Sequence, residues 1–587
     1  MTSPFQALTQ RYERLVEDAA LPPFGFSTEK ISYALVLSAD GEIVDVDSLL
    51  DTGGKKPRPR SLLVPQPAKR TSGVASNFLW DKTAYVLGAS AVSKRPAQEH
   101  AAFVDLHEQL LDETSDEGLV ALLRFLRAWS PERFHEVPHA DEVLDTVVVF
   151  RLDGELRFMH DRPDAQQIWA EHLAAAAAEE ATCLVTGRRA RIARLHPPIK
   201  GVAGAQSAGA SIVSFNQEAF TSYGNEQGAN APVSERAAFA YTTALNALLA
   251  RDSGHSVRLA DTTIAFWADT PAAESLARGL FDPPAPDEKG EAAKIRDVLE
   301  EMAKGRALAD ATPDVAPDAR FYLLGLAPNA ARLSVRFWLD TTMGELAARF
   351  QQHWRDLRIE PEPWGARLPA LWRLLYELAA QRKAENVPAQ IAGELTRAVL
   401  TGARYPRSLL SAALMRLRAD HDVNGRRVAI IKACLVRDAR LSGRAYSKED
   451  FVSLDPNGPP AYQLGRLFAV LETVQRSALG RINATIRDRY YGAASATPAA
   501  VFPLLVRNAN HHLALLRKTK GGWAHTLDRR IGEIIETQGT AWPRALGIED
   551  QGRFAIGYYH ERFGEHSPIK DAPEPETTDD ETIVDED

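Results

Sequence analysis

The sequence predicts an α+β fold: a mixed α/β N-terminal domain, then a mainly helical middle region and a C-terminal helical bundle. Short apolar runs flanked by turn residues recur in the first 270 residues, which is typical of strands. From residue 342 onward, Leu, Ala and Arg recur at helical spacing. Proline-rich breaks then divide the chain. The predicted domains are 1–270, a linker at 271–291, a β-hairpin plus helices at 292–453, a bundle at 461–565 and an acidic tail at 566–587.

The first domain is predicted to mix helices with strands. Asp40-Gly41 is a hairpin turn signal between two strand-like runs. In order, we expect helix 5–16, strands 31–37 and 42–46, helices 97–111 and 118–129, strand 146–152, helix 165–180, strand-like alternation at 183–195 and a closing hairpin at 256–268.

The stretch Ser211–Leu249 is the most distinctive part of this domain. Residues 212–215 form an apolar run that predicts a buried strand, and residues 222–231 form a polar loop rich in Gly, Asn and Gln. Asn230 or Ser234 is expected to cap the helix that follows. An ordinary β–α connection is one interpretation of this loop, and a set of amides that reads base edges is the other.

The second half is predicted to be helical after two strands. A break at LDPNGPP, residues 454–460, begins the last bundle. We expect strands 321–326 and 332–339 and helices 342–354, 369–381, 388–401, 407–419, 426–435, 462–478, 481–489, 498–517, 525–537 and 552–563.

The net charge of −9 comes from the C-terminus. Residues 571–587 hold nine of the 78 acids and no Lys or Arg, so 69 acids face 69 basic residues in the rest of the chain. The tail is therefore expected to be solvated and disordered, and the body neutral with local patches.

Basic residues gather in three stretches that hold almost no acids. Residues 52–80 and 181–217 contain no acid, and residues 473–527 contain only Asp488. Each stretch fits either a solvated surface or a contact with nucleic-acid backbone. The basic residues of the second and third stretches include Arg188, Arg189, Arg191, Arg194, Lys200, Arg481, Arg487, Arg507, Arg517 and Lys518.

Several chemistries are not expected from this sequence. Cys183 and Cys434 are too few for a disulfide framework or a four-cysteine metal site, which indicates a reducing, cytoplasmic setting. CLVTG at Cys183 resembles half of a zinc knuckle without its second Cys, so no metal is predicted. We find no nucleotide-binding or catalytic motif and no membrane-spanning run, and we expect a non-enzyme without cofactors.

Three segments carry a family resemblance: KRTSGVASNFLWDKTAYVLG at 69–88, CLVTG…ARLHPPIKG at 183–201, and the stretch 211–249. With them the chain resembles the large subunit of the type I-C CRISPR surveillance complex (the Csd family, Cascade) from its first helix to about residue 565. The resemblance implies a subunit that recognises the protospacer-adjacent motif in duplex DNA, helps to unwind the target and holds the displaced strand. It implies as partners the crRNA-bound backbone and crRNA-processing subunits and a helicase–nuclease.

The resemblance also implies a C-terminal bundle, starting near Pro460, that resembles the family's small subunit and is in some members made separately from the same gene. The alternatives are a metal-dependent nuclease and an architectural subunit without DNA readout. The residues expected to read the motif are Lys69, Arg70, Thr71, Ser72 and Asn77 in the first loop and Asn225, Gln227 and Asn230 in the second.

Overall fold

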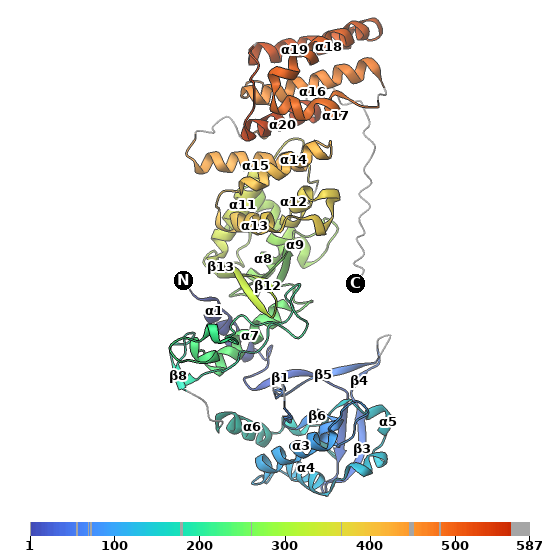
Figure 1. The fold of residues 1–587 in the computed structure, drawn as a ribbon, viewed down its shortest axis with the longest axis vertical. Coiled ribbons are helices and arrows are strands. Elements are labelled where there is room, and N and C mark those ends of the chain that lie inside the picture. The colour runs from blue at the N-terminus through green and yellow to red at the C-terminus, as the bar shows by residue number, and fades with distance from the viewer. Residues whose placement is uncertain are drawn as a thin grey trace. The chain divides into compact units, whose positions relative to one another are not determined.

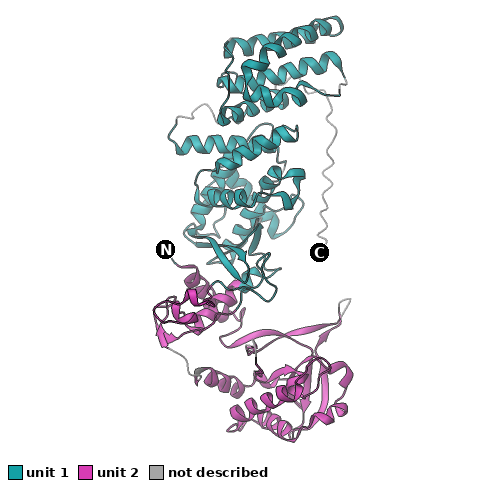
Figure 2. Cartoon of the chain, in the orientation of Figure 1, with its two compact units in different colours: residues 1–2, 198–212, 246–587 teal, residues 3–197, 213–245 magenta. Residues whose placement is uncertain are grey.

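The computed structural model describes residues 2–53, 57–68, 70, 73–175, 180–259, 261–365, 367–444, 451–480, 483–539 and 541–564. It confirms the α+β class (Figure 1). Strands and helices alternate up to residue 342, and the described elements after that residue are all helices. The chain divides into two compact units, of which unit 1 holds residues 1–2, 198–212 and 246–587 and unit 2 holds residues 3–197 and 213–245 (Figure 2).

Unit 2 is built on a four-stranded sheet of order β3-β2-β7-β6, in which β2 and β7 run parallel. Alternation along the strands divides their side chains between two faces. Leu35, Leu37 and Phe150 enter one core with α3 and α4, while Ala34 and Val149 enter a smaller core on the other face. The elements are β2 (Tyr33–Leu37), β3 (Ile43–Ser48), β6 (Trp80–Lys82), β7 (Val147–Leu152), α3 (Pro96–Leu111) and α4 (Glu117–Ala128). The predicted hairpin, its Asp40-Gly41 turn and both helices are confirmed.

A second sheet, of order β1-β5-β4, contributes to the smaller core through Ile31 and Val64. β5 (Arg58–Pro65) lies inside the basic stretch and pairs with β1 (Phe26–Ile31) and β4 (Leu50–Asp51). The remaining elements of unit 2 are α1 (Pro4–Glu17), α2 (Thr83–Val86), α5 (Ala140–Val143), α6 (Pro163–Ala175), β8 (Glu180–Thr182), β9 (Arg189–Arg191) and the short helices η1 (Pro131–Glu136), η2 (Met159–Asp161), η3 (Glu218–Phe220) and η4 (Gln227–Asn230).

For the stretch 211–249, the predicted loop and helix are confirmed, but the predicted strand is wrong. Residues 212–215 form no strand and are half-exposed. The β-bridge at this point is made by the preceding residue, Ser211, with Arg332, and does not extend into 212–215. The helix α7 (Glu235–Leu249) begins after Ser234, whose hydroxyl accepts a hydrogen bond from the amide of Ala237 (3.3 Å). The apolar stripe of this helix, at 238, 241, 245, 248 and 249, is buried throughout.

Unit 1 begins with an antiparallel sheet of order β10-β11-β12-β13: β10 (Ser256–Leu259), β11 (Thr262–Ala268), β12 (Arg320–Asn329) and β13 (Arg332–Thr342). The hairpin at 256–268 was expected to close the first domain, but it pairs with β12 instead. Residues 271–281 were expected to be linker, but they form α8 (Pro271–Phe281). Proline is well tolerated in a first helical turn, and the Thr270 hydroxyl caps this helix.

The rest of unit 1 is helical. The middle helices are α9 (Glu291–Ala303), α10 (Leu308–Ala311), α11 (Met343–Leu357), α12 (Leu371–Leu378), α13 (Ala389–Thr401), α14 (Arg407–Ala419) and α15 (Gly425–Leu441), with η5 (Ala380–Arg382) and η6 (Ala384–Asn386) between α12 and α13. The C-terminal bundle contains α16 (Pro460–Leu479), α17 (Ile486–Ala496), α18 (Pro498–Thr519), α19 (Gly521–Gln538) and α20 (Ile548–Phe563). The break before Pro460 is confirmed, and the predicted helix 481–489 starts five residues late, at Ile486. The tail 566–587 lies outside the described residues.

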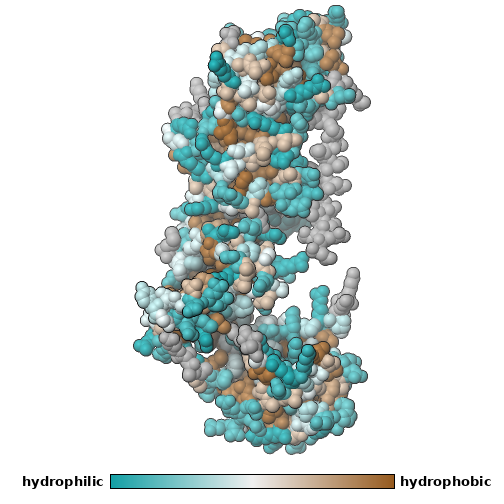
Figure 3. Space-filling model, viewed as in Figure 1, coloured by the Kyte–Doolittle hydropathy of each residue, from teal (hydrophilic) through white to brown (hydrophobic). Residues whose placement is uncertain are grey.

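On the face drawn in Figure 3, hydrophobic residues are interspersed with hydrophilic ones over both units. Among the described residues, no helix is sufficiently long and apolar to cross a bilayer.

Candidate nucleic-acid interface

The first predicted reading loop is anchored by a buried carboxylate, Asp81. Its side chain accepts hydrogen bonds from the amides of Asn77 (3.0 Å) and Lys82 (2.8 Å) and forms an ion pair with Arg70. Burial raises the pKa of Asp81, and the Arg70 guanidinium opposes that rise. Asn77 is buried as well, and its side-chain oxygen accepts a hydrogen bond from the amide of Ala68 (2.9 Å). These contacts give Arg70 and Asn77 an anchoring role.

Arg70 is engaged on two further sides. Its Nε donates to the carbonyl of Ala75 (2.6 Å), and its guanidinium lies over the ring of Tyr85 at 4.0 Å. Lys69, Thr71 and Ser72, which were expected to read the motif with it, lie outside the described residues. Base reading by this loop therefore stays a prediction, and Arg70 would have to leave Asp81 to take part.

A buried histidine supports the end of the same loop. The amide of Leu79, at φ 65°, donates to Nε2 of His107 (2.9 Å), and Nδ1 of His107 donates to the carbonyl of Phe103 (2.7 Å). Burial lowers the pKa of His107 to about 4, so the ring is neutral at pH 7 and Nε2 accepts. Sequence reasoning missed both Asp81 and His107.

The CLVTG motif forms the tight turn between β8 and β9. The amide of Cys183 donates to the carbonyl of Arg188 (2.9 Å), and the amide of Gly187, at φ 69°, donates to the carbonyl of Cys183 (2.8 Å). Cys183 Sγ accepts a hydrogen bond from the amide of Ser234 (3.2 Å). Burial raises the pKa of this thiol, but hydrogen bonds from Ser234 and Thr186 outweigh it and lower the pKa to about 7. The knuckle-like turn thus ties the hairpin to the start of α7.

The arginines of this hairpin divide into structural and exposed groups. Arg191 is half-buried; it donates to the carbonyl of Leu173 and pairs with Glu235 at 3.8 Å. Arg188, Arg189 and Arg194 are exposed, and Arg189 lies 3.6 Å from Glu180. The exposed three remain suited to contact with phosphates.

The second predicted reading loop is held closed by Asn230. Its Oδ1 accepts a hydrogen bond from the amide of Ser222 (2.9 Å), and its Nδ2 donates to the carbonyls of Asn225 (2.9 Å) and Gln227 (3.1 Å). Gln227 Oε1 accepts a hydrogen bond from Nε of Arg194 (2.8 Å). Asn230 and Gln227 are therefore occupied within the protein. Asn225 is exposed, and its side-chain amide makes no hydrogen bond with the described residues.

Gly228 packs this loop against the segment that follows β9. Its amide donates to the carbonyl of Arg194 (3.1 Å), and a Cβ at this position would lie 2.0 Å from the carbonyl oxygen of Ala193. Glycine is therefore required for the close approach. Tyr223, at the tip of the loop, is fully exposed. Sequence reasoning did not select it, although it lies two residues before Asn225 in a loop that was selected.

Unit 1 carries the other residues that were expected to contact backbone phosphates. Lys200 is exposed and its amide donates to Oδ1 of Asn246 (2.8 Å). Arg507 and Lys518 are exposed on α18, and Arg517 pairs with Asp528 at 2.8 Å.

Arg487 differs from these because it is half-buried. Its positive charge faces Tyr558 and Glu472, which is fully buried. The charge of Arg487 is therefore directed toward groups inside the bundle. Arg481 lies outside the described residues.

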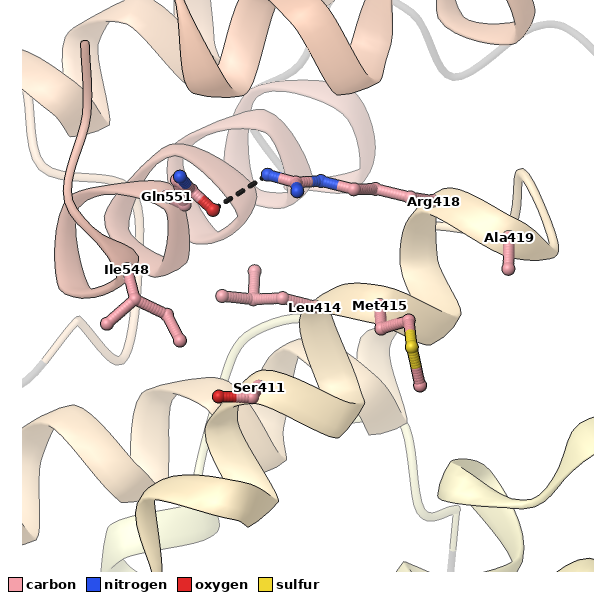
Figure 4. A pocket seen from close by; sticks show the side chains of 7 residues that line it. All are labelled: Ser411, Leu414, Met415, Arg418, Ala419, Ile548 and Gln551. Carbon is pink, nitrogen blue, oxygen red and sulfur yellow. Dashed lines mark hydrogen bonds between the residues drawn. The ribbon is translucent and has the colours of Figure 1, made fainter.

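A pocket in unit 1 lies between α14 and the start of α20 (Figure 4). Arg418 donates to Oε1 of Gln551 across it (2.7 Å). Because Arg418 and Gln551 bond to each other rather than to a ligand, we do not assign this pocket to the nucleic-acid interface. Within the described ranges, no group of three or more His, Cys, Asp or Glu is placed to hold a metal ion.

The family model described as CRISPR-associated protein (Cas_Csd1) matches residues 8–563. The chain belongs to this family. As a Cas_Csd1 protein it is the large subunit of type I-C Cascade, and so part of a multi-subunit CRISPR complex. The resemblance seen in the sequence is confirmed over nearly the whole chain. No curated protein matches it.

Proposed function

We propose that this chain recognises the motif that flanks the target in duplex DNA, through the loop Ser222–Asn230 of unit 2. The observation that carries the proposal is the closure of this loop by Asn230, which leaves the Asn225 amide exposed. An amide in a fixed loop is suited to a bidentate contact with the edge of adenine. In RNA-guided systems the protein reads a short flank while guide pairing reads the target sequence.

The same proposal assigns roles to the basic residues. Arg188 and Arg189 lie on the β8–β9 hairpin, and Arg194 follows it and is bonded to the loop. There they would contact phosphates and set the register of the loop. On α18, Arg507 and Lys518 would hold the displaced strand. The subunit would help to unwind the target and present the displaced strand to the helicase–nuclease, in the cytoplasm and without catalysis of its own. A separately translated copy of the C-terminal bundle belongs to this proposal.

Replacing Asn225 by Ala in the guide-loaded complex is expected to reduce discrimination between preferred and altered flanking trinucleotides. One lost bidentate base contact corresponds to about 1–3 kcal/mol, or roughly 5- to 150-fold in relative affinity. The measurement is the affinity for duplexes that differ only in the flank, with matched single-stranded target as the control for guide pairing.

Asn510→Ala, at an exposed amide on α18, is the matched control and should leave discrimination unchanged. Native discrimination in Asn225→Ala would contradict the site. A native complex without any flank preference would support an architectural subunit, and metal-dependent cleavage of DNA or RNA by the isolated chain would support a nuclease.

A further inference from the structure

Tyr223 occupies an unfavourable position for its side chain. Of the described aromatic residues it is the most exposed, at 100%. Its φ of 53° lies in the left-handed region, which Asn, Asp and Gly adopt more readily than Tyr. The ring gains no burial, and the backbone is strained. The fold therefore does not account for a tyrosine here.

The backbone that presents the ring is nevertheless well defined. The amide of Asn225 donates to the carbonyl of Ser222 (2.9 Å), which closes a turn with Tyr223 and Gly224 at its centre. Both central residues have positive φ, 53° and 77°, as a type I′ turn requires. Asn230 bonds the two ends of this turn through Ser222 and Asn225. A ring on a braced turn loses little conformational entropy when it binds a partner.

The surroundings favour nucleic acid as that partner. The loop is bonded to Arg194, which follows β9, and the exposed Arg188 and Arg189 lie where the same strand begins. Aromatic rings combined with basic groups bind single-stranded nucleic acid, because every base has a face on which a ring can stack. Glu226 is exposed in the loop and disfavours a phosphate at its own position, but it does not prevent stacking.

We propose that Tyr223 stacks on an unpaired base of the target DNA beside the flanking motif. This rests on the proposed function of the loop and deepens it. Asn225 would read the flank, and the Tyr223 ring would hold the adjoining base pair open. Opening the first pair is the step that allows the guide to begin pairing.

The test compares two targets for the guide-loaded complex, one fully paired and one with the two base pairs next to the flank mismatched. Tyr223→Ala should slow guide–target pairing on the paired target at least about 5-fold, the lower end of the effect of one lost stacked base. On the mismatched target, where these two base pairs are already open, the Tyr223→Ala complex should pair at the native rate. Tyr223→Phe should retain the native rate on both. Leu156→Ala, at a 95% exposed apolar residue of the same unit, is the matched control.

A native rate for Tyr223→Ala on the paired target would overturn the proposal, as would slow pairing that the mismatches do not restore. Loss of complex assembly in Tyr223→Ala, measured by size-exclusion chromatography, would show that the ring docks on a protein subunit and would also overturn it. The Asn225→Ala measurement remains separate. If Asn225→Ala keeps flank discrimination while the mismatches restore the rate of Tyr223→Ala, the proposed reading of the flank by Asn225 is wrong and the proposed stacking by Tyr223 is supported.

Discussion

A Gly557→Ala variant is expected to lose about 3 kcal/mol or more of unfolding free energy, the upper end of what overpacking costs. A Cβ at Gly557 in α20 would lie 2.0 Å from the carbonyl oxygen of Tyr462 in α16. The contact is reciprocal, since a Cβ at Gly465 in α16 would lie 1.9 Å from the carbonyl oxygen of Phe554 in α20. Backbone atoms cannot rotate away as a side chain can, so the two helices would have to separate. Urea unfolding followed by circular dichroism measures the loss.

Gly492→Ala is the matched control for this variant. Gly492 lies in α17 with no atom within 4 Å of an added Cβ. Alanine is favoured over glycine inside a helix by about 1 kcal/mol, so this substitution should leave stability unchanged or raise it. A Gly557→Ala protein as stable as the native one would show that α16 and α20 are not in backbone contact.

Asp356→Ala is expected to destabilise unit 1 by about 3–5 kcal/mol, because it leaves a buried charge without its partner. Asp356 is fully buried and accepts hydrogen bonds from Arg437 (2.7 Å) and Arg440 (2.7 and 3.0 Å). Arg437 is only 1% exposed, so its guanidinium has no access to water in place of the carboxylate. Asp297→Ala, which removes an exposed partner of Arg296, should change stability by less than about 1 kcal/mol.

The pH dependence of the same pair gives a second measurement. Burial raises the pKa of Asp356, but the hydrogen bonds and charges of Arg440 and Arg437 outweigh it and leave the pKa below its usual value. A carboxyl group with a lowered folded-state pKa contributes stability above the unfolded value of about 4, and this is lost as the pH falls through the folded value. The native protein should therefore lose stability relative to Asp356→Ala below about pH 4. A constant difference between the two proteins down to pH 2 would contradict the ion pair.

The pattern of apolar residues was sufficient to predict the helices and strands that bury those residues in a core. The apolar stripe of α7 and the apolar runs of β2 and β7 all lie in buried cores. Residues 212–215 show where this fails. An apolar run forms a strand only if a neighbouring strand pairs with it. Here the bridge made by Ser211 does not continue into residues 212–215. Residues 271–281 were assigned to the linker together with the Pro-rich run that follows them. That they form a helix depends on the Thr270 cap and on the core that α8 joins, neither of which the local sequence shows.

The sequence located the segments of the candidate site, but it was less successful in selecting which side chains in them are free to bind. The loop 222–230 was located from its composition, but which amide stays exposed depends on the hydrogen bonds of Asn230. Arg70 and Asn77 were selected as readers because their residue types suit DNA. Their engagement follows from Asp81, whose burial depends on the tertiary packing around it. A single sequence does not show which residues are neighbours in space, so these hydrogen bonds and ion pairs could not be predicted from it.

The central claim is that the loop Ser222–Asn230 contacts the flank of the target. The most direct measurement uses target duplexes with 5-iododeoxyuridine in the flanking motif, irradiated in the guide-loaded complex and followed by mass spectrometry of the cross-linked peptides. An adduct within residues 222–230, reduced in Asn225→Ala and in duplexes with a non-preferred flank, is the predicted result. An adduct confined to the C-terminal bundle or to another subunit would contradict the account.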